Sequence, residues 1–350
     1  MKRIIFIVED KESAQYRYRC HNVMAALSSE KEWSTKCYLT SEVISKDIDI
    51  QAGDIVLIER QTAKNNDMLN FIKYAYENRA KVLFDLDDLI FDYRDIPVLM
   101  KATNSKNIAY WLGYFWGIRR IAKKVDGFIV TNDFLGKKIK RTFGKPYKVV
   151  RNSLNDEQIK KGSKIKKKTD DKFVIGYFSG SPTHKNDFEM VQPQLVKFLK
   201  KHDDAVMVVV GYMEFNSEAK KMIDAGRIKV VELVDYLKLL ELMSEADVNI
   251  APLVISDFTN CKSELKFFEA AVVETTTIAS PTYSFKQAII DGKNGFLAKS
   301  EQWYDKIEYL YLHTAENKKI AKAARDYAIK NYSGKVFLKE VEEAYGSFAK

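Results

Sequence analysis

The chain has 350 residues, of which 46% are apolar and 30% charged, a balance that excludes a largely disordered protein. No apolar run reaches the roughly 18 residues of a membrane-spanning helix, and Cys20, Cys37 and Cys261 lack the C-x-x-C spacing of a zinc site or disulfide framework. We therefore expect a globular protein of the reducing cytoplasm, whose formal charge of +9 favours anionic ligands.

Apolar runs typical of buried strands alternate with helical patterns through the first half of the chain. We expect strands at residues 3–8, 54–59, 80–86, 127–131 and 147–155, and helices near 16–28, 71–78 and 133–142. This alternation predicts a parallel sheet in a first domain of residues 1–160. Glu9 and Asp10 directly follow the first run, which favours a buried strand over a signal peptide.

A lysine-rich segment separates this half from a second β/α series. Its lysines indicate a solvated polar linker: Lys160, Lys161, Lys164, Lys166, Lys167 and Lys168. Strands are expected at 173–180, 205–212, 228–232, 248–253 and 275–281, with helices near 188–201, 236–244 and 264–273. We predict an α/β fold with a second domain at residues 170–330, so that two Rossmann-like domains face a ligand-binding cleft.

The C-terminal stretch from Glu316 is helical in pattern, with a break at Ser333 and Gly334. This pattern predicts a closing pair of helices. We expect residues 331–350 to form a final helix that packs back on the first domain.

Four aspartates gather around the end of the strand expected at 80–86: Asp85, Asp87, Asp88 and Asp92. A D-x-D pattern can bind a divalent metal ion through carboxylate oxygens, and an aspartate at a strand end can equally cap a loop or helix. Clustered carboxylates also raise one another's pKa, which would let one of them accept a proton near neutral pH.

Two further stretches of the first half carry cations. Arg17 and Arg19 follow the first strand, where paired guanidinium groups can bind an acceptor or donor phosphate; a solvated helix face is the alternative. Residues 110–124, YWLGYFWGIRRIAKK, mix aromatic with basic side chains, as interfacial helices do. Contact with a membrane-held lipid acceptor and ordinary core packing with a basic exposed end both fit this pattern.

In the second half, the segment CKSELKFFEAA predicts a helix that begins at Ser263. Ser263 is the expected N-cap and Glu264 a first-turn carboxylate. The first-turn N–H groups, the helix dipole and Lys262 would favour a diphosphate, while Glu269 could accept hydrogen bonds from ribose hydroxyls. A charged surface helix is the alternative.

The region around this helix, VNIAPLVISDFTNCKSELKFFEAAVVETTTIASPTYSFKQAIIDGKNGFLA, resembles the donor-binding region of family 4 glycosyltransferases with the two-domain GT-B fold. These enzymes commonly carry two glutamates in an E-x7-E arrangement. Glu269 matches the second, which the resemblance implies binds the ribose, whereas Cys261 stands at the first. The form N-x-x-K-S-x-x-K-F-x-E, read from Asn260, resembles a bacterial branch of the family and implies that Lys262 contacts the diphosphate.

The segment IGYFSGSPTHKNDFEMV, at the first strand of the second half, resembles the glycine-bearing loop that approaches the donor phosphates in this family. Gly180 would let backbone come close to a phosphate. With it, Ser181, His184 and Lys185 are the expected donor contacts. A plain strand-to-helix turn is the alternative.

The resemblance implies a retaining glycosyltransferase of bacterial surface polysaccharide or glycoconjugate synthesis. It would move a sugar from a nucleotide diphosphate-sugar in the second domain to a glycan or lipid-linked acceptor in the first. In this resemblance, Asp87 or Asp88 would lie beside the centre where the sugar is transferred. We expect no metal and no cofactor beyond the donor.

The expected site of action is the cytoplasm, with peripheral contact at the inner membrane face as an option. No zinc-finger spacing or aromatic RNA-binding signature is present, so we expect no nucleic-acid partner. A nucleotide-sugar epimerase of the same fold and a non-catalytic partner subunit are the alternatives.

Overall fold

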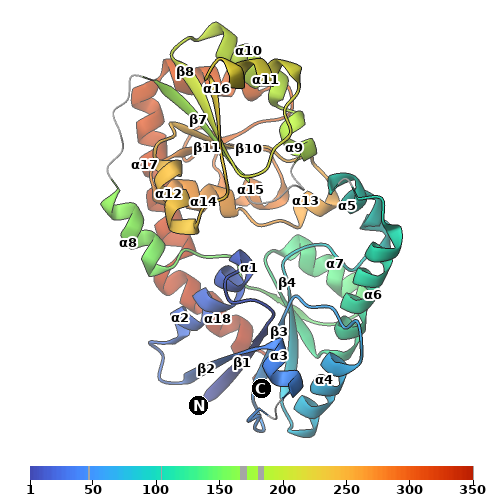
Figure 1. Cartoon of the computed structure of the whole chain (residues 1–350). Coiled ribbons are helices and arrows are strands. Elements are labelled where there is room, and N and C mark those ends of the chain that lie inside the picture. The colour runs from blue at the N-terminus through green and yellow to red at the C-terminus, as the bar shows by residue number, and fades with distance from the viewer. Residues whose placement is uncertain (46–47, 104, 166–171, 180–184, 350) are drawn as a thin grey trace.

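The computed structural model describes residues 1–45, 48–103, 105–165, 172–179 and 185–349. Figure 1 shows two α/β halves stacked on each other, with the N-terminal half below. Each half contains a six-stranded sheet in which every strand pair is parallel. The predicted α/β fold with two Rossmann-like domains is confirmed.

The first sheet has the order β2-β1-β3-β4-β5-β6. Its strands are β1 (Lys2–Val8), β2 (Trp33–Leu39), β3 (Ile55–Glu59), β4 (Lys81–Leu86), β5 (Gly127–Val130) and β6 (Tyr147–Val149). Its helices after β2 are α3 (Thr40–Ser45), α4 (Asp67–Glu77), α5 (Ile96–Ala102), α6 (Ile108–Lys124) and α7 (Asp133–Phe143), with a short η2 (Tyr93–Asp95) before α5. Apolar side chains of α4, α6 and α7 fill the core on one face of this sheet.

The helix expected near residues 16–28 is present but irregular. It consists of α1 (Ala14–Tyr16), a π-helical turn η1 (Arg17–His21) and α2 (Asn22–Leu27). A π turn inserts an extra residue and so rotates the side chains that follow, and such turns are frequent at functional sites. Both Tyr18 and Arg19 are buried in this turn.

The second sheet has the order β12-β11-β10-β7-β8-β9. Its strands are β7 (Phe173–Phe178), β8 (Ala205–Val210), β9 (Ile228–Val231), β10 (Val248–Ala251), β11 (Thr276–Ala279) and β12 (Phe296–Leu297). Its helices are α9 (Lys185–Glu189), α10 (Gln192–Lys201), α11 (Ser217–Asp224), α12 (Tyr236–Ser244), α13 (Asp257–Asn260), α14 (Leu265–Val272), α15 (Tyr283–Ala288) and α16 (Trp303–Leu312).

The lysine-rich segment begins as a helix, α8 (Asp156–Lys164), and not as the solvated linker that its composition predicted. Asn155 and Gln158 form a reciprocal capping box at its start, which explains why the helix forms there. Gln158 is fully buried and donates a hydrogen bond to the Tyr18 hydroxyl at 2.9 Å. Helix α8 therefore packs against both halves, whereas Lys166, Lys167 and Lys168 lie outside the described residues.

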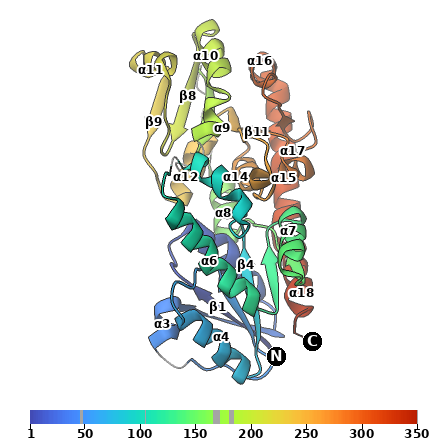
Figure 2. The same ribbon diagram turned by 90° about the vertical axis from the view of Figure 1, so that its right-hand side faces the viewer.

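The chain ends with α17 (Thr314–Tyr332) and α18 (Gly334–Gly346). Figures 1 and 2 show α17 running along the second half and α18 lying against the first sheet. Phe337, Val341 and Tyr345 of α18 pack with β1 residues in a single core. Gly334 has a φ of 55°, a left-handed conformation that favours glycine, so the chain turns between the two helices at this residue.

No helix in the described part of the chain is both long and apolar enough to cross a membrane. The same residues contain no group of three or more His, Cys, Asp or Glu side chains arranged to hold a metal ion.

Candidate functional site

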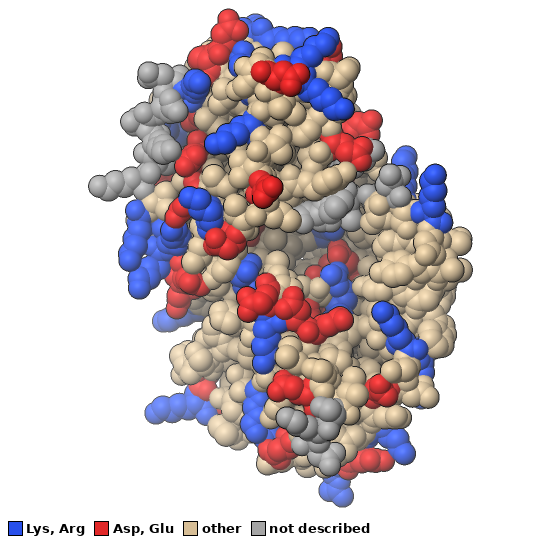
Figure 3. Space-filling view, in the orientation of Figure 1, with Lys and Arg blue, Asp and Glu red and all other residues tan. Residues whose placement is uncertain are grey.

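A cavity of about 210 Å³ lies between the two halves, at the carboxyl ends of strands from both sheets. Figure 3 shows the molecule hollowed between its upper and lower parts, with acidic and basic side chains around the hollow. The lining residues are Ala14, Gln15, Tyr18, Arg19, Asp87, Asp88, Thr131 and Asn152 from the first half and Leu253, Lys262, Ser263, Leu265, Lys266 and Phe285 from the second. Polar groups of both halves thus converge on one space.

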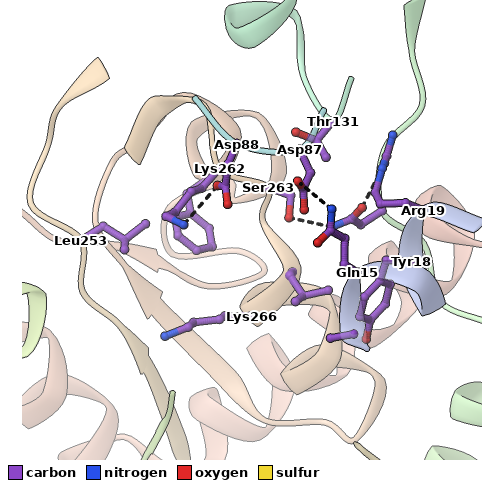
Figure 4. Close-up of a pocket in the computed structure, with 14 residues that line it drawn as sticks. Gln15, Tyr18, Arg19, Asp87, Asp88, Thr131, Leu253, Lys262, Ser263 and Lys266 are labelled. Carbon is purple, nitrogen blue, oxygen red and sulfur yellow. Dashed lines mark hydrogen bonds and ion pairs between the residues drawn. The ribbon is translucent and has the colours of Figure 1, made fainter. Parts of the chain in front are cut away.

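Asp87 and Asp88 line this cavity and directly follow β4, which is buried from Val82 to its end at Leu86 (Figure 4). Arg60, which follows β3, donates from Nη1 to Asp87 Oδ1 at 3.0 Å and to Asp88 Oδ2 at 2.8 Å. Burial opposes ionisation of Asp88, but Lys262 and Arg60 lower its pKa to about 2. The prediction that clustering raises the aspartate pKa is therefore wrong for Asp88, because two cations contact it.

Burial, with a contribution from Asp87, does raise the pKa of Asp85, a member of the predicted cluster. A second carboxyl group with a raised pKa is one that the sequence did not single out. Glu59, the last residue of β3, is buried, and burial together with Asp87 and Asp85 raises its pKa to about 8. Its Oε1 atom has no hydrogen-bond partner among the described residues. Glu59 is therefore the carboxyl group of this cluster that can hold a proton near neutral pH.

Lys262 reaches across the cavity from the second half. Its Nζ lies 3.3 Å from Asp88 Oδ1 (Figure 4). It also lies 4.6 Å from the ring centroid of Phe258. Without an anionic ligand the ammonium is thus paired with a carboxylate of the other half. Because only one of its three N–H donors is engaged with a side chain in the described residues, the group can bind further acceptors.

Lys266, one turn further along, also lines the cavity but was not among the predicted contacts. Its Nζ is buried, has no hydrogen-bond partner among the described residues, and lies 4.7 Å from the ring centroid of Tyr177. Burial lowers its pKa to about 8. The second lysine of the form N-x-x-K-S-x-x-K-F-x-E was the sequence signal for this residue.

The residues at the start of α14 differ from the prediction. Glu264, and not Ser263, occupies the N-cap, and no side chain caps the helix. The Ser263 hydroxyl lines the cavity and accepts a hydrogen bond from Asn152 Nδ2 at 2.9 Å. Glu264 is buried outside the cavity lining, where burial raises its pKa and Tyr332 hydrogen-bonds to it, so the prediction of a donor contact there is corrected.

Glu269 lies behind the cavity wall. The Tyr18 hydroxyl, which belongs to the first half, donates a hydrogen bond to Glu269 Oε1 and itself accepts one from Gln158. Burial raises the pKa of Glu269 to about 7, although Tyr18 and Arg17 oppose the increase. Glu269 therefore faces the other half, at the end of the cavity that Tyr18 closes.

Arg17 and Arg19, the two arginines that follow the first strand, make different contacts. Arg19, with 1% of its surface exposed, donates from Nε and Nη2 to both oxygens of Asp85 at 2.9 and 2.8 Å, and from Nη1 to Val150 O and Asn152 Oδ1. Four of its five N–H donors are thus engaged within the first half, which gives Arg19 a positioning role, while the phosphate contact predicted for it stays a prediction. Arg17 instead stacks on the Tyr236 ring, 3.6 Å from its centroid, next to Glu269.

Three of the expected loop contacts, Gly180, Ser181 and His184, lie outside the described residues. Lys185 is described only as the first residue of α9.

Cys261, at the position of the missing glutamate, is fully buried against the core of the first half. Its carbonyl accepts a hydrogen bond from Asn132 Nδ2 at 2.9 Å, so this position holds the two halves together and does not line the cavity.

Comparison with known proteins bears on the second half of the chain. Residues 173–313 match the family model described as "Glycosyl transferases group 1". This segment contains β7 to α16 and all cavity residues of the second half. No curated protein sequence matches the chain.

Solved structures share the whole architecture. Sucrose-phosphate synthase from Thermosynechococcus elongatus is 13% identical over 99% of both chains, with a TM-score of 0.67. Anabaena HepE in complex with UDP-glucose is 14% identical over 99% of both chains, with a TM-score of 0.63. A variant of S. aureus TarM in complex with UDP is 15% identical, with a TM-score of 0.58, over 85% of this chain, which spans 56% of the TarM chain. These likenesses confirm the predicted GT-B fold.

Proposed function

We propose that this chain, whose residues 173–313 form a group 1 glycosyltransferase domain, transfers a sugar from a nucleotide diphosphate-sugar to a saccharide or lipid-linked acceptor. The observation that carries the proposal is the interdomain cavity, where Lys262 and Lys266 of the second half meet Asp87 and Asp88 of the first. A diphosphate needs cations, and the developing charge on it is what a sugar transferase must stabilise.

The donor diphosphate lies, in this proposal, between the two lysines and the uncapped start of α14. The absence of a side-chain cap leaves first-turn N–H groups for phosphate oxygens. Lys262 exchanges Asp88 for a phosphate, and Lys266 Nζ, which has no hydrogen-bond partner among the described residues, donates to another phosphate oxygen. A ribose hydroxyl takes the place of the Tyr18 hydroxyl at Glu269.

The transfer itself follows a retaining course in which the acceptor attacks on the face that the diphosphate leaves. A bond forms between the acceptor oxygen and the anomeric carbon, while the bond from that carbon to the diphosphate breaks and leaves its electron pair on oxygen. The diphosphate takes the hydroxyl proton, so no separate base is needed. Asp88, released by Lys262 but still bonded to Arg60, orients the acceptor hydroxyl together with Asp87. No metal and no further cofactor enters this scheme.

The surface of α6, in the half proposed to bind the acceptor, supports an acceptor that is held in a membrane. Ile108 and Leu112 of α6 expose about half of their side chains, and Lys123 and Lys124 follow in the last turn. Exposed apolar side chains beside cations are typical of contact with an anionic membrane surface. We therefore place the reaction in the cytoplasm, at the inner membrane face, in bacterial surface polysaccharide or glycoconjugate synthesis.

Titration calorimetry with UDP, GDP and ADP tests the donor site, since HepE and TarM were both solved with UDP or a UDP-sugar. We expect one diphosphate to bind wild type and to bind Lys262→Met at least ten-fold more weakly. The solvent-exposed Lys339→Met is the control, since it lies on α18 away from the cavity. A folded wild-type protein that binds none of the three would refute the proposal and favour a non-catalytic subunit.

A further inference from the structure

A second cavity, of about 500 Å³, adjoins the first but lies wholly within the N-terminal half. Its walls come from the loops after β1 and β3 and from one face of α6, the helix on the outside of this half in Figure 2. Its volume falls in the range of about 300–1,000 Å³ that is usual for small-molecule sites. None of the donor contacts proposed above lines it.

One wall of this second cavity is aromatic. Tyr110 and Tyr114 lie one turn apart with nearly parallel rings, at 6.2 Å between centroids and 19° between planes, and Trp116 is next to them. Flat aromatic faces that carry phenolic hydroxyl groups suit a ligand that has both C–H faces and polar edges.

The opposite wall is charged. Glu9, Arg60 and Lys64 contribute a carboxylate and two cations, beside the polar Gln61 and Thr62. Such a mixture offers acceptors and donors to the hydroxyl groups of a sugar ring. A purely apolar ligand would leave these charges desolvated without a partner, which is costly.

Gly113, in the middle of α6, gives the second cavity its depth. A Cβ added at this residue would meet nothing within 4 Å, whereas at Gly117 it would lie 3.0 Å from Thr62 Cβ. Packing therefore explains Gly117 but not Gly113. Glycine inside a helix costs about 0.5–1 kcal/mol relative to alanine, so the helix gives up stability to keep this space open.

Arg60 connects the two cavities. It lines the second cavity, and its Nη1 atom donates to Asp87 and Asp88, which line the first. A ligand in the second cavity is thus separated from the proposed diphosphate position only by this group of ion pairs. An acceptor hydroxyl that extends past Arg60 would approach Asp88 and Lys262, where the transfer takes place.

We infer that the second cavity binds a sugar ring of the acceptor, stacked on Tyr110 and Tyr114, with one hydroxyl directed past Arg60 toward Asp87 and Asp88. This inference rests on the proposed function and adds the acceptor class: a saccharide bound by its ring, whether free or attached to a lipid.

Filling the cavity tests the inference. Gly113→Phe places a ring in the open space, and Gly346→Phe is the matched control, because Gly346 lies on α18 and its added Cβ would also meet nothing within 4 Å. Saturation-transfer NMR is recorded with hexoses, hexosamines and uronic acids. Each is offered both free and as its octyl glycoside, so that the two spectra separate a soluble from a lipid-linked acceptor.

We expect wild type and Gly346→Phe to give saccharide signals, and Gly113→Phe to lose them at least ten-fold while its melting temperature is unchanged or higher. UDP affinity should stay within two-fold in all three. Equal saccharide signals in folded Gly113→Phe, or no signal from any saccharide with wild type that binds UDP, would overturn the inference. Saccharide binding to wild type that binds no nucleotide would refute the proposed function but not the second cavity.

Discussion

Replacing Lys266 with methionine should weaken nucleotide binding and stabilise the ligand-free protein at the same time. The Lys266 ammonium is buried, has no hydrogen-bond partner among the described residues, and lies 4.7 Å from the Tyr177 ring centroid. The Asp187 and Glu269 carboxylates offset its burial only in part. The folded protein therefore bears the cost of a desolvated charge until an anion arrives. Methionine fills similar space without that charge.

The structure sets the size of both effects. A pKa of about 8 in place of 10.5 corresponds to a cost of about 3 kcal/mol for a charged Lys266. Methionine should thus raise the free energy of unfolding by about 1–3 kcal/mol at pH 7. In wild type this cost is present below pH 8 and disappears as the pH rises toward 10.5, because the unfolded chain then also loses its proton. Loss of a charged hydrogen bond of about 1.5–3 kcal/mol should weaken UDP binding about 10- to 150-fold.

Urea unfolding at pH 7 and pH 10 measures the stability, and calorimetry at pH 7 measures UDP affinity. The gain in stability should shrink at pH 10, and Lys339→Met should change neither quantity. Unchanged UDP affinity in Lys266→Met, or a loss of stability at pH 7, would show that Lys266 is a packing residue and refute its role at the diphosphate.

Asp88→Asn should free Lys262 and tighten UDP binding about five-fold, since a partly exposed ion pair is worth about 1 kcal/mol; weaker binding in low-salt calorimetry would show that Asp88 helps to hold the nucleotide. Arg19→Met leaves the Asp85 carboxylate buried without its partner and should lower the free energy of unfolding by about 3–5 kcal/mol; a loss below about 1 kcal/mol in urea would contradict a positioning role. Because burial raises the pKa of Glu269 from 4.5 to about 7, the folded state holds this proton more tightly, and wild type should lose stability as the pH rises between those values. Glu269→Gln should remove that part of the slope, and equal slopes in both proteins would mean that Glu269 ionises normally.

The fold could be predicted from local patterns because each β/α unit is encoded within a short stretch of sequence. Parallel strands such as β8, AVMVVV, appear as uninterrupted apolar runs, and β3 is apolar up to Glu59, so their positions needed no tertiary information. The lysine-rich segment was misread because its composition hid the capping box of Asn155 and Gln158, which starts α8.

The site was less predictable, because its geometry depends on the π turn and on contacts between the halves. Tyr18 and Arg19 are neighbours in sequence, yet one bonds to Glu269 in the second half and the other to Asp85 in the first. The low pKa of Asp88 depends on Lys262, which is 174 residues away. No local pattern specifies such pairs.

A crystal structure of the protein with UDP tests the proposed donor site most directly. We predict that phosphate oxygens lie within about 3 Å of Lys262 Nζ and Lys266 Nζ, that Asp88 has lost its contact with Lys262, and that the ribose faces Glu269. UDP bound elsewhere, with the Asp88–Lys262 pair still at 3.3 Å, would contradict the proposal that this cavity is the site of transfer.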